Sequence, residues 1–148
     1  MPVEHFLRGT TPYVRYHNSY GKVWEEPAEV AFFEASRRET IFCQIDQELP
    51  IHLNINKPKI LTRRHGSLVE KVCRPESDLD ILIIFSVLDR QDYIKYAGFW
   101  MRNLIRDNFK NRDVFCGVYH RPIFLDLFFA IFDQSTQQEL MVKPTEDQ

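Results

Sequence analysis

The sequence lacks the features that mark a secreted or membrane-bound protein. Its three cysteines are far apart and form no Cys-x-x-Cys pair, which argues against a disulfide framework and a zinc site. No stretch approaches the ~18 apolar residues of a membrane span, and the N-terminus has no apolar signal-peptide region. We therefore expect a soluble, cytoplasmic protein with reduced thiols and no membrane contact.

An excess of one charge is also missing. The formal net charge is −2, so any contact with nucleic acid must come from a local patch rather than from a global basic field. The chain has 148 residues, of which 44% are hydrophobic, and it shows no internal repeat. These values predict one domain over residues 1–148, in which 1–26 form an N-terminal extension and 134–148 a flexible tail.

The first half of the chain contains extended segments on either side of one helical segment. Residues 13–24 predict two short strands around a turn. Pro27 suits a first helical position, and the apolar residues that follow predict a helix from Pro27 to Glu48 that Pro50 stops. Alternation then predicts a short strand over 51–55, and a second extended piece over 59–64 leads into a Gly-Ser turn.

The second half predicts the remaining elements of one sheet. Asp78 to Phe85 is apolar on both faces after its acidic start, which indicates a central strand. The other expected elements are brief helix 68–72, helix 91–110, strands 114–119 and 123–132, and a frayed tail from Asp133 with a short turn near 137–140. Together they predict an α+β domain with a mixed β-sheet and helices mainly on one face.

Two aspartates follow the Gly66-Ser67 turn at the start of this central strand. Because alternate residues of a strand face the same way, Asp78 and Asp80 project to one side while Leu79 points to the other. Glycine lets the backbone approach a phosphate closely, and a helix that begins there directs N–H groups at an anion. The stretch therefore indicates a site for a divalent metal and a nucleotide.

A third aspartate, Asp126, lies in the middle of the otherwise apolar strand 123–132. A lone carboxylate there is costly to bury unless a cation or hydrogen bonds neutralise it. If this strand lies beside the Asp78–Asp80 strand, three carboxylates converge, and such oxygen ligands suit Mg²⁺ or Mn²⁺. Two alternatives stay open: Asp126 is instead a structural acid, paired with Arg121 or serving as a helix cap, and Asp113 and Asp133 are rival third acids, although both suit surface positions better.

The motif resembles the signature of the DNA polymerase β-type nucleotidyltransferase superfamily, in particular its minimal, single-domain members. Gly66-Ser67 is followed, after nine intervening residues, by Ser77-Asp78-Leu79-Asp80. The likeness is close from Lys59 to about Phe85 and extends loosely to Asp126. It implies a nucleotidyltransferase fold in which Gly66 and Ser67 bind the triphosphate, with Lys71 and Ser77 as further nucleotide-binding candidates. Asp78, Asp80 and Asp126 would bind the metals and carry the catalysis.

The resemblance implies an enzyme that depends on Mg²⁺ or Mn²⁺. It would transfer a nucleoside monophosphate, with AMP from ATP as the first candidate, to a hydroxyl group of a protein or RNA acceptor and release pyrophosphate. Asp126 would also take up the proton of the acceptor hydroxyl. Minimal members of the family are often encoded beside a small helical protein, so such a partner is a further implication.

The chain also departs from the family pattern near the glycine turn. Lys71 stands where the family usually carries a second glycine, and Arg63-Arg64-His65 stand where it usually has apolar residues. Lys71 would either bind phosphate or crowd the loop. These departures support an alternative function, a catalytically silent nucleotidyltransferase fold that serves as a binding or regulatory subunit. A third hypothesis is an RNA-binding module that uses the aromatic residues among 1–25.

Overall fold

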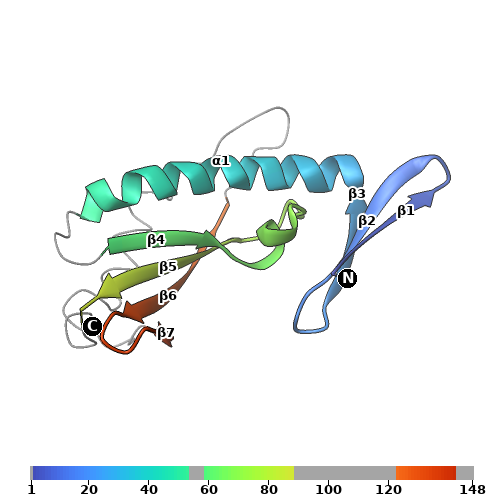
Figure 1. The fold of residues 1–148 in the computed structure, drawn as a ribbon. Helices are drawn as coiled ribbons and strands as arrows, with labels where there is room; N and C mark the ends of the chain where they lie inside the picture. The colour runs from blue at the N-terminus through green and yellow to red at the C-terminus, as the bar shows by residue number, and fades with distance from the viewer. Residues whose placement is uncertain (1, 54–58, 89–122, 143–148) are drawn as a thin grey trace.

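The computed structural model describes residues 2–53, 59–88 and 123–142. These residues carry two β-sheets and a long helix that lies over the larger sheet (Figure 1). The elements are β1 (Val3–Arg8), β2 (Thr11–His17), β3 (Val23–Pro27), α1 (Ala28–Leu53), β4 (Lys59–Arg64), the 3₁₀ helix η1 (Gly66–Glu70), β5 (Leu79–Val87), β6 (Leu125–Asp133) and β7 (Gln138–Val142).

The larger sheet has the order β4-β5-β6-β7. Strands β5 and β6 run parallel, whereas β4 and β7 are antiparallel to their neighbours, so the sheet is mixed. Strand β5 lies between β4 and β6, which confirms the central position predicted from its apolar faces. The predicted α+β class with a mixed sheet is thereby confirmed, within the described residues, and the predicted strand at 123–132 corresponds to β6.

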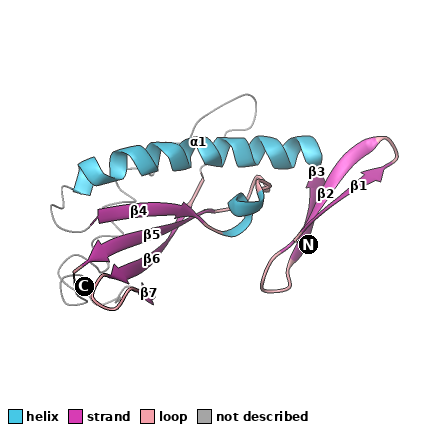
Figure 2. Cartoon of the chain, viewed as in Figure 1, coloured by secondary structure: helices cyan, strands magenta, loops and turns pink. Residues whose placement is uncertain are grey.

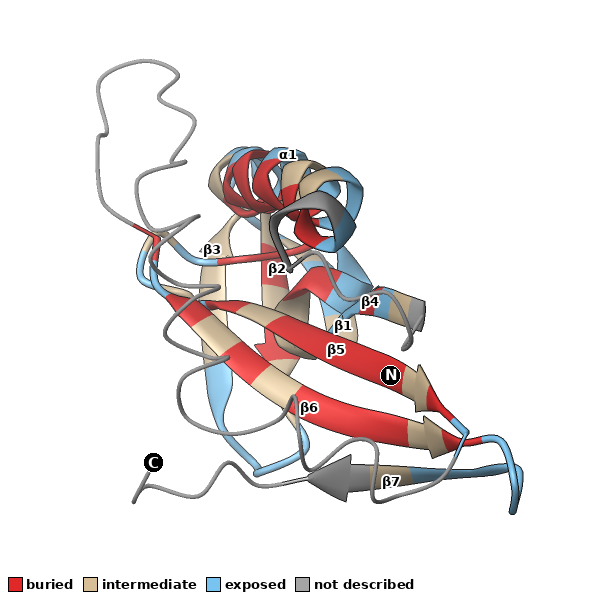
Figure 3. Ribbon diagram, turned by 90° about the vertical axis from the view of Figure 1, so that its left-hand side faces the viewer, coloured by how far each residue is buried: buried red, intermediate tan, exposed pale blue. Residues whose placement is uncertain are grey.

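Strands β5 and β6 are buried along most of their length (Figure 3), and the alternation of their side chains separates two faces of this sheet. The odd-numbered residues, among them Ile81, Ile83 and Leu127, are almost completely buried in the main core, which also includes Ile45 and Leu49 of α1. The even-numbered residues lie on the opposite face, where a smaller apolar cluster includes Leu82, Ile84 and Ala130. Asp80 and Asp126 belong to this second face, at one end of it.

Helix α1 does not end where the sequence predicted. It runs to Leu53 with Pro50 inside it, and it begins at Ala28, because Pro27 still belongs to β3. A proline removes one backbone hydrogen bond, and here only the last turn of the helix follows it, so the cost is not sufficient to stop the helix. The strand predicted over 51–55 is therefore wrong for 51–53, and residues 54–58 lie outside the described part.

The N-terminal residues form a sheet of their own, with the order β1-β2-β3 (Figure 2). The two strands predicted within 13–24 are confirmed as parts of β2 and β3, and β1 was not predicted. The inner face of this sheet places Val14 and Tyr16 against Ala28 and Ala31 of α1, and against Val72 from the loop after η1. The small sheet thus packs against both the start of α1 and the loop that leads to β5.

Two further predictions require correction. The brief helix predicted over 68–72 is a 3₁₀ helix that begins at Gly66. The tail predicted to fray from Asp133 instead turns at 134–137 and returns as β7, where Leu140 pairs with Ile131 and packs against the main core. The left-handed backbone of Gln137, with φ of 59°, allows that turn. The predicted helix 91–110 and strand 114–119 lie outside the described residues.

Candidate metal centre

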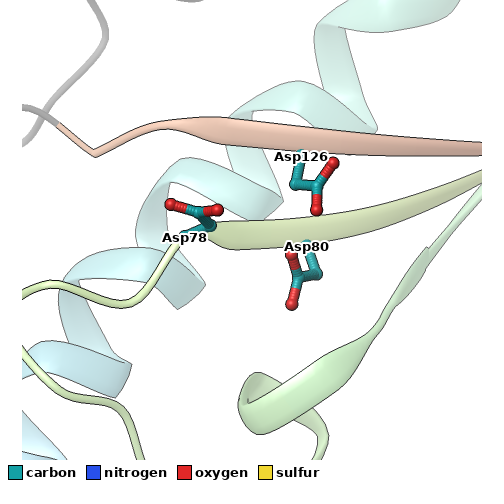
Figure 4. Close-up of side chains that lie close together, drawn as sticks. All are labelled: Asp78, Asp80 and Asp126. Carbon is teal, nitrogen blue, oxygen red and sulfur yellow. The ribbon is translucent and has the colours of Figure 1, made fainter.

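Three carboxylates meet where β5 and β6 begin. Asp80 and Asp126 are direct partners in the parallel pairing of the two strands, and Asp78 precedes β5 by one residue. One oxygen of each carboxylate lies within 4.8 Å of the other two, as expected for ligands of a shared cation (Figure 4). The structure therefore confirms that Asp126 joins the pair predicted at the start of the central strand.

The electrostatics of the cluster centre on Asp80. Burial, as the largest cause, acts together with the negative charges of Asp126 and Asp78 and a hydrogen bond with Asp126 to raise the pKa of this carboxyl group from 3.8 to about 7. Ionisation of all three acids at once is therefore unfavourable. A divalent cation would remove this repulsion, because it offers each carboxylate a positive partner.

Gly66 packs directly against Asp80. Its φ of 66° lies in the left-handed region, and a Cβ atom added there would lie only 2.2 Å from the Oδ2 atom of Asp80. The backbone N–H of His65 donates to the backbone oxygen of Asp80 at 3.1 Å, which holds the turn against β5. Glycine is required here for two independent reasons, the backbone conformation and the space that the Asp80 carboxyl group occupies.

The other predicted nucleotide-binding residues occupy different surroundings. The hydroxyl of Ser67 lies 3.5 Å from the Sγ atom of buried Cys73. The Ser77 hydroxyl accepts the backbone N–H of Arg74 at 2.9 Å and closes the loop before Asp78. Lys71 ends η1 in the left-handed conformation, with φ of 61° and ψ of 32°. The loop therefore adopts, at Lys71, the backbone geometry that glycine favours.

The basic residues near the turn gather along the edge strand β4. Arg63, Arg64 and Lys71 line a pocket there whose lining includes none of the three aspartates. Arg64 donates from Nε to Glu39 at 2.7 Å and stacks its guanidinium over the ring of Phe42. These contacts hold Arg64 on the α1 side of the sheet, on the face opposite the carboxylates.

Of the two rival third acids, Asp133 is described by the structure and lies away from the cluster. Asp133 lies at the far end of β6, where its carboxylate accepts the N–H and hydroxyl of Ser135 at 2.9 and 2.6 Å. It is largely buried rather than a surface group, contrary to the sequence prediction. Asp113, and the Arg121 proposed as a structural partner of Asp126, lie outside the described residues.

Two buried, charged residues of α1 near the site were not predicted from the sequence. Glu34 and Arg38 of α1 are both buried, and the Nη1 atom of Arg38 lies 2.7 Å from Oε2 of Glu34. Arg38 also donates to the backbone oxygens of Pro75 and Ser77, in the loop that ends at Asp78. The sequence does contain a signal that could have indicated them. Arg38 lies on the apolar stripe of the helix, three residues after Ala35, and the acid Glu34 lies one turn earlier.

Comparison of the chain with protein-family models, with curated proteins and with solved structures found no match. Among the described residues, no helix is both long enough and apolar enough to cross a membrane. The evidence for function therefore comes from the geometry of the site.

Proposed function

We propose that the chain is a metal-dependent nucleotidyltransferase. It would transfer a nucleoside monophosphate, with AMP as the first candidate, to a hydroxyl group of a protein or RNA acceptor. The observation that carries this proposal is the meeting of Asp78, Asp80 and Asp126 within 4.8 Å of one another, beside the turn that Gly66 opens. The resemblance of the Gly-Ser and Asp-x-Asp spacing to the polymerase β-type superfamily supports the same function.

The three residues fit Mg²⁺ or Mn²⁺ in their donor chemistry. All three ligands are carboxylate oxygens, which hard divalent cations prefer over softer metals. The raised pKa of Asp80 supplies a second argument, since the cluster is electrostatically unfavourable without a positive charge. When bound, such ions would lower the pKa of an attacking hydroxyl and neutralise the charge of the triphosphate.

Binding of the triphosphate and uptake of the proton would fall to different residues of the chain. The Gly66 turn packs directly against Asp80, so a triphosphate bound at this turn would lie next to that carboxyl group. Asp126 would orient the acceptor hydroxyl and take up its proton. The acceptor oxygen then forms a bond to the α-phosphorus while the bond to the β-phosphate oxygen breaks, and pyrophosphate leaves with its electron pair.

The test is transfer of label from ATP that carries radioactive phosphorus at the α-position, with Mg²⁺ or Mn²⁺, followed by analysis of the protein and of added RNA and protein fractions. Parallel reactions with the other nucleoside triphosphates would establish base choice. Asp80→Asn and Asp126→Asn should abolish labelling, whereas Asp133→Asn, at the far end of β6, should leave it unchanged. Equal labelling by Asp80→Asn and the wild type would refute the assignment.

One observation favours the alternative, a silent fold that binds a partner without catalysis. Lys71 and Arg64, two of the cations that could hold a triphosphate, line the pocket along β4 and not the carboxylate cluster. A silent subunit would show neither labelling nor Mn²⁺-dependent binding of nucleotide. Binding of nucleotide without transfer to any acceptor would point to a regulatory subunit.

A further inference from the structure

Arg38 of α1 is the most completely buried charged residue among those described, with 0% of its surface exposed. A guanidinium has five N–H donors, and burial is costly when any of them lacks a partner. Here the donors reach the backbone oxygen and Oε2 of Glu34 at 3.0 and 2.7 Å, and the backbone oxygen of Pro75 at 3.2 Å. Nε and Nη2 both reach the backbone oxygen of Ser77, at 3.1 and 2.7 Å.

The contact with Ser77 bears directly on Asp78. Arg38 binds the carbonyl oxygen of Ser77, and this carbonyl is part of the peptide bond that joins Ser77 to Asp78. Asp78 itself lies before β5, so no strand pairing holds it. On its other side, the N–H of Leu79 donates to the backbone oxygen of Phe124 at 2.8 Å. The backbone of Asp78 is thus anchored at both neighbours, on one side by Arg38 and on the other by the start of β5.

Stability alone does not account for an ion pair in this place. Replacing a buried ion pair with apolar residues of similar volume is often neutral or stabilising, so such a pair is weak evidence for a role in stability. Apart from Arg37, which also pairs with Glu34, the other buried residues of this helix face from Ala35 through Phe42 to Leu49 are apolar. What an apolar side chain at position 38 could not supply is a fork of donors aimed at the carbonyls of the loop before Asp78.

We propose that Arg38 is a positioning residue for the metal centre. It fixes the Pro75–Ser77 loop so that the carboxylate of Asp78 stays within reach of Asp80 and Asp126. This inference rests on the proposed function, because it assumes that the three carboxylates bind a cation. Arg38 lies behind the site, on the helix side of the loop, and acts only through the backbone of Asp78.

Mn²⁺ titration of the full-length protein tests the proposal, with bound metal followed by electron paramagnetic resonance. Arg38→Lys keeps a positive charge next to Glu34 but loses the planar fork, so the affinity for Mn²⁺ should fall about tenfold, as is typical when a residue behind a metal ligand is lost. Ile45→Val is the matched control, since Ile45 is equally buried on α1 and lies in the main core. This control should lower thermal stability and leave Mn²⁺ affinity unchanged.

A double-mutant cycle separates positioning from general damage. If Arg38 acts through Asp78, then Arg38→Lys should have no further effect on Mn²⁺ affinity in an Asp78→Asn background. An equal loss in both backgrounds would mean a merely structural role and would overturn the proposal. Wild-type affinity in Arg38→Lys would also overturn it, as would failure of both Arg38→Lys and Arg38→Gln to fold. Absence of Mn²⁺ binding by the wild type would instead refute the proposed function.

Discussion

Replacing Asp80 with asparagine should make the metal-free protein more stable while it destroys the metal site. Each unit of difference in pKa corresponds to about 1.4 kcal/mol. The difference between 3.8 and about 7 at Asp80 therefore corresponds to at most ~4 kcal/mol of unfavourable free energy when the carboxyl group is ionised. The group is only partly buried, and solvent screening reduces this to about 2 kcal/mol. Asparagine removes the charge and can still hydrogen-bond to Asp126.

The sign of this effect depends on pH. The folded state holds the Asp80 proton more tightly than the unfolded state, so stability falls as the pH rises from 3.8 to about 7. At about pH 5 the wild-type carboxyl group is still protonated in the folded state but ionised in the unfolded state, so Asp80→Asn should gain only roughly a third of the full stabilisation. At about pH 8 the variant should be more stable by about 2 kcal/mol, measured by urea unfolding with a chelator present.

Adding Mg²⁺ should reverse the order, because only the wild type gains stability from a bound ion. Asp133→Asn is the control, since hydrogen bonds from Ser135 lower the pKa of the Asp133 carboxyl group. That stabilisation is present above the ordinary pKa of aspartate and is lost only as the pH falls through the lowered value, so this variant should be destabilised equally at both pH values. The reasoning is refuted if Asp80→Asn is less stable than the wild type at about pH 8, or if the difference between them does not change with pH.

Three further predictions concern the loop beside the cluster. Gly66→Ala should lower Mn²⁺ affinity at least tenfold, because its Cβ would displace the Asp80 carboxyl group; Gly9→Ala, with a similar φ and nothing near its Cβ, should cost only stability. Lys71→Gly should raise the free energy of unfolding by about 0.5 kcal/mol, because the cost of the left-handed conformation for lysine slightly exceeds the entropic cost that glycine adds through the unfolded chain. A loss of stability in urea unfolding would mean that the lysine side chain makes stabilising contacts. Cys73 should react with a thiol reagent only when the protein unfolds, because burial raises the pKa of its thiol and excludes the reagent; rapid labelling of the folded protein, located by mass spectrometry, would contradict its buried position.

The sequence could predict the strands of the site because each is an almost continuous apolar run. The acidic start of β5 and the lone acid of β6 are visible as departures from apolar runs, and so is the glycine before them. That the two strands are neighbours could be stated only as a condition, and that they run parallel was not predicted, since pairing between distant segments leaves no local signal. The structure supplied that pairing, with Asp80 opposite Asp126.

The missed features have different causes, and tertiary contacts override the local signal in two of them. Pro50 predicts a helix end, yet the helix continues to Leu53, because a proline so close to the end costs too little to stop it. The polar residues of β7 predict a loose tail, yet Leu140 anchors a strand. Arg38 interrupts an apolar stripe, and only the folded loop shows that its donors are all used.

The in-register pairing of Asp80 with Asp126 couples the accuracy of the site to the packing of the core. A shift of β6 by one residue would turn Asp126 toward α1 and move Leu127 out of the main core to the opposite face, so the same error would disrupt both the site and the core. The hydrophobic contacts that select the correct strand register therefore also set the positions of the two acids. Once the core has formed with this register, Asp80 and Asp126 are already aligned. No further interaction is needed to bring these two acids together.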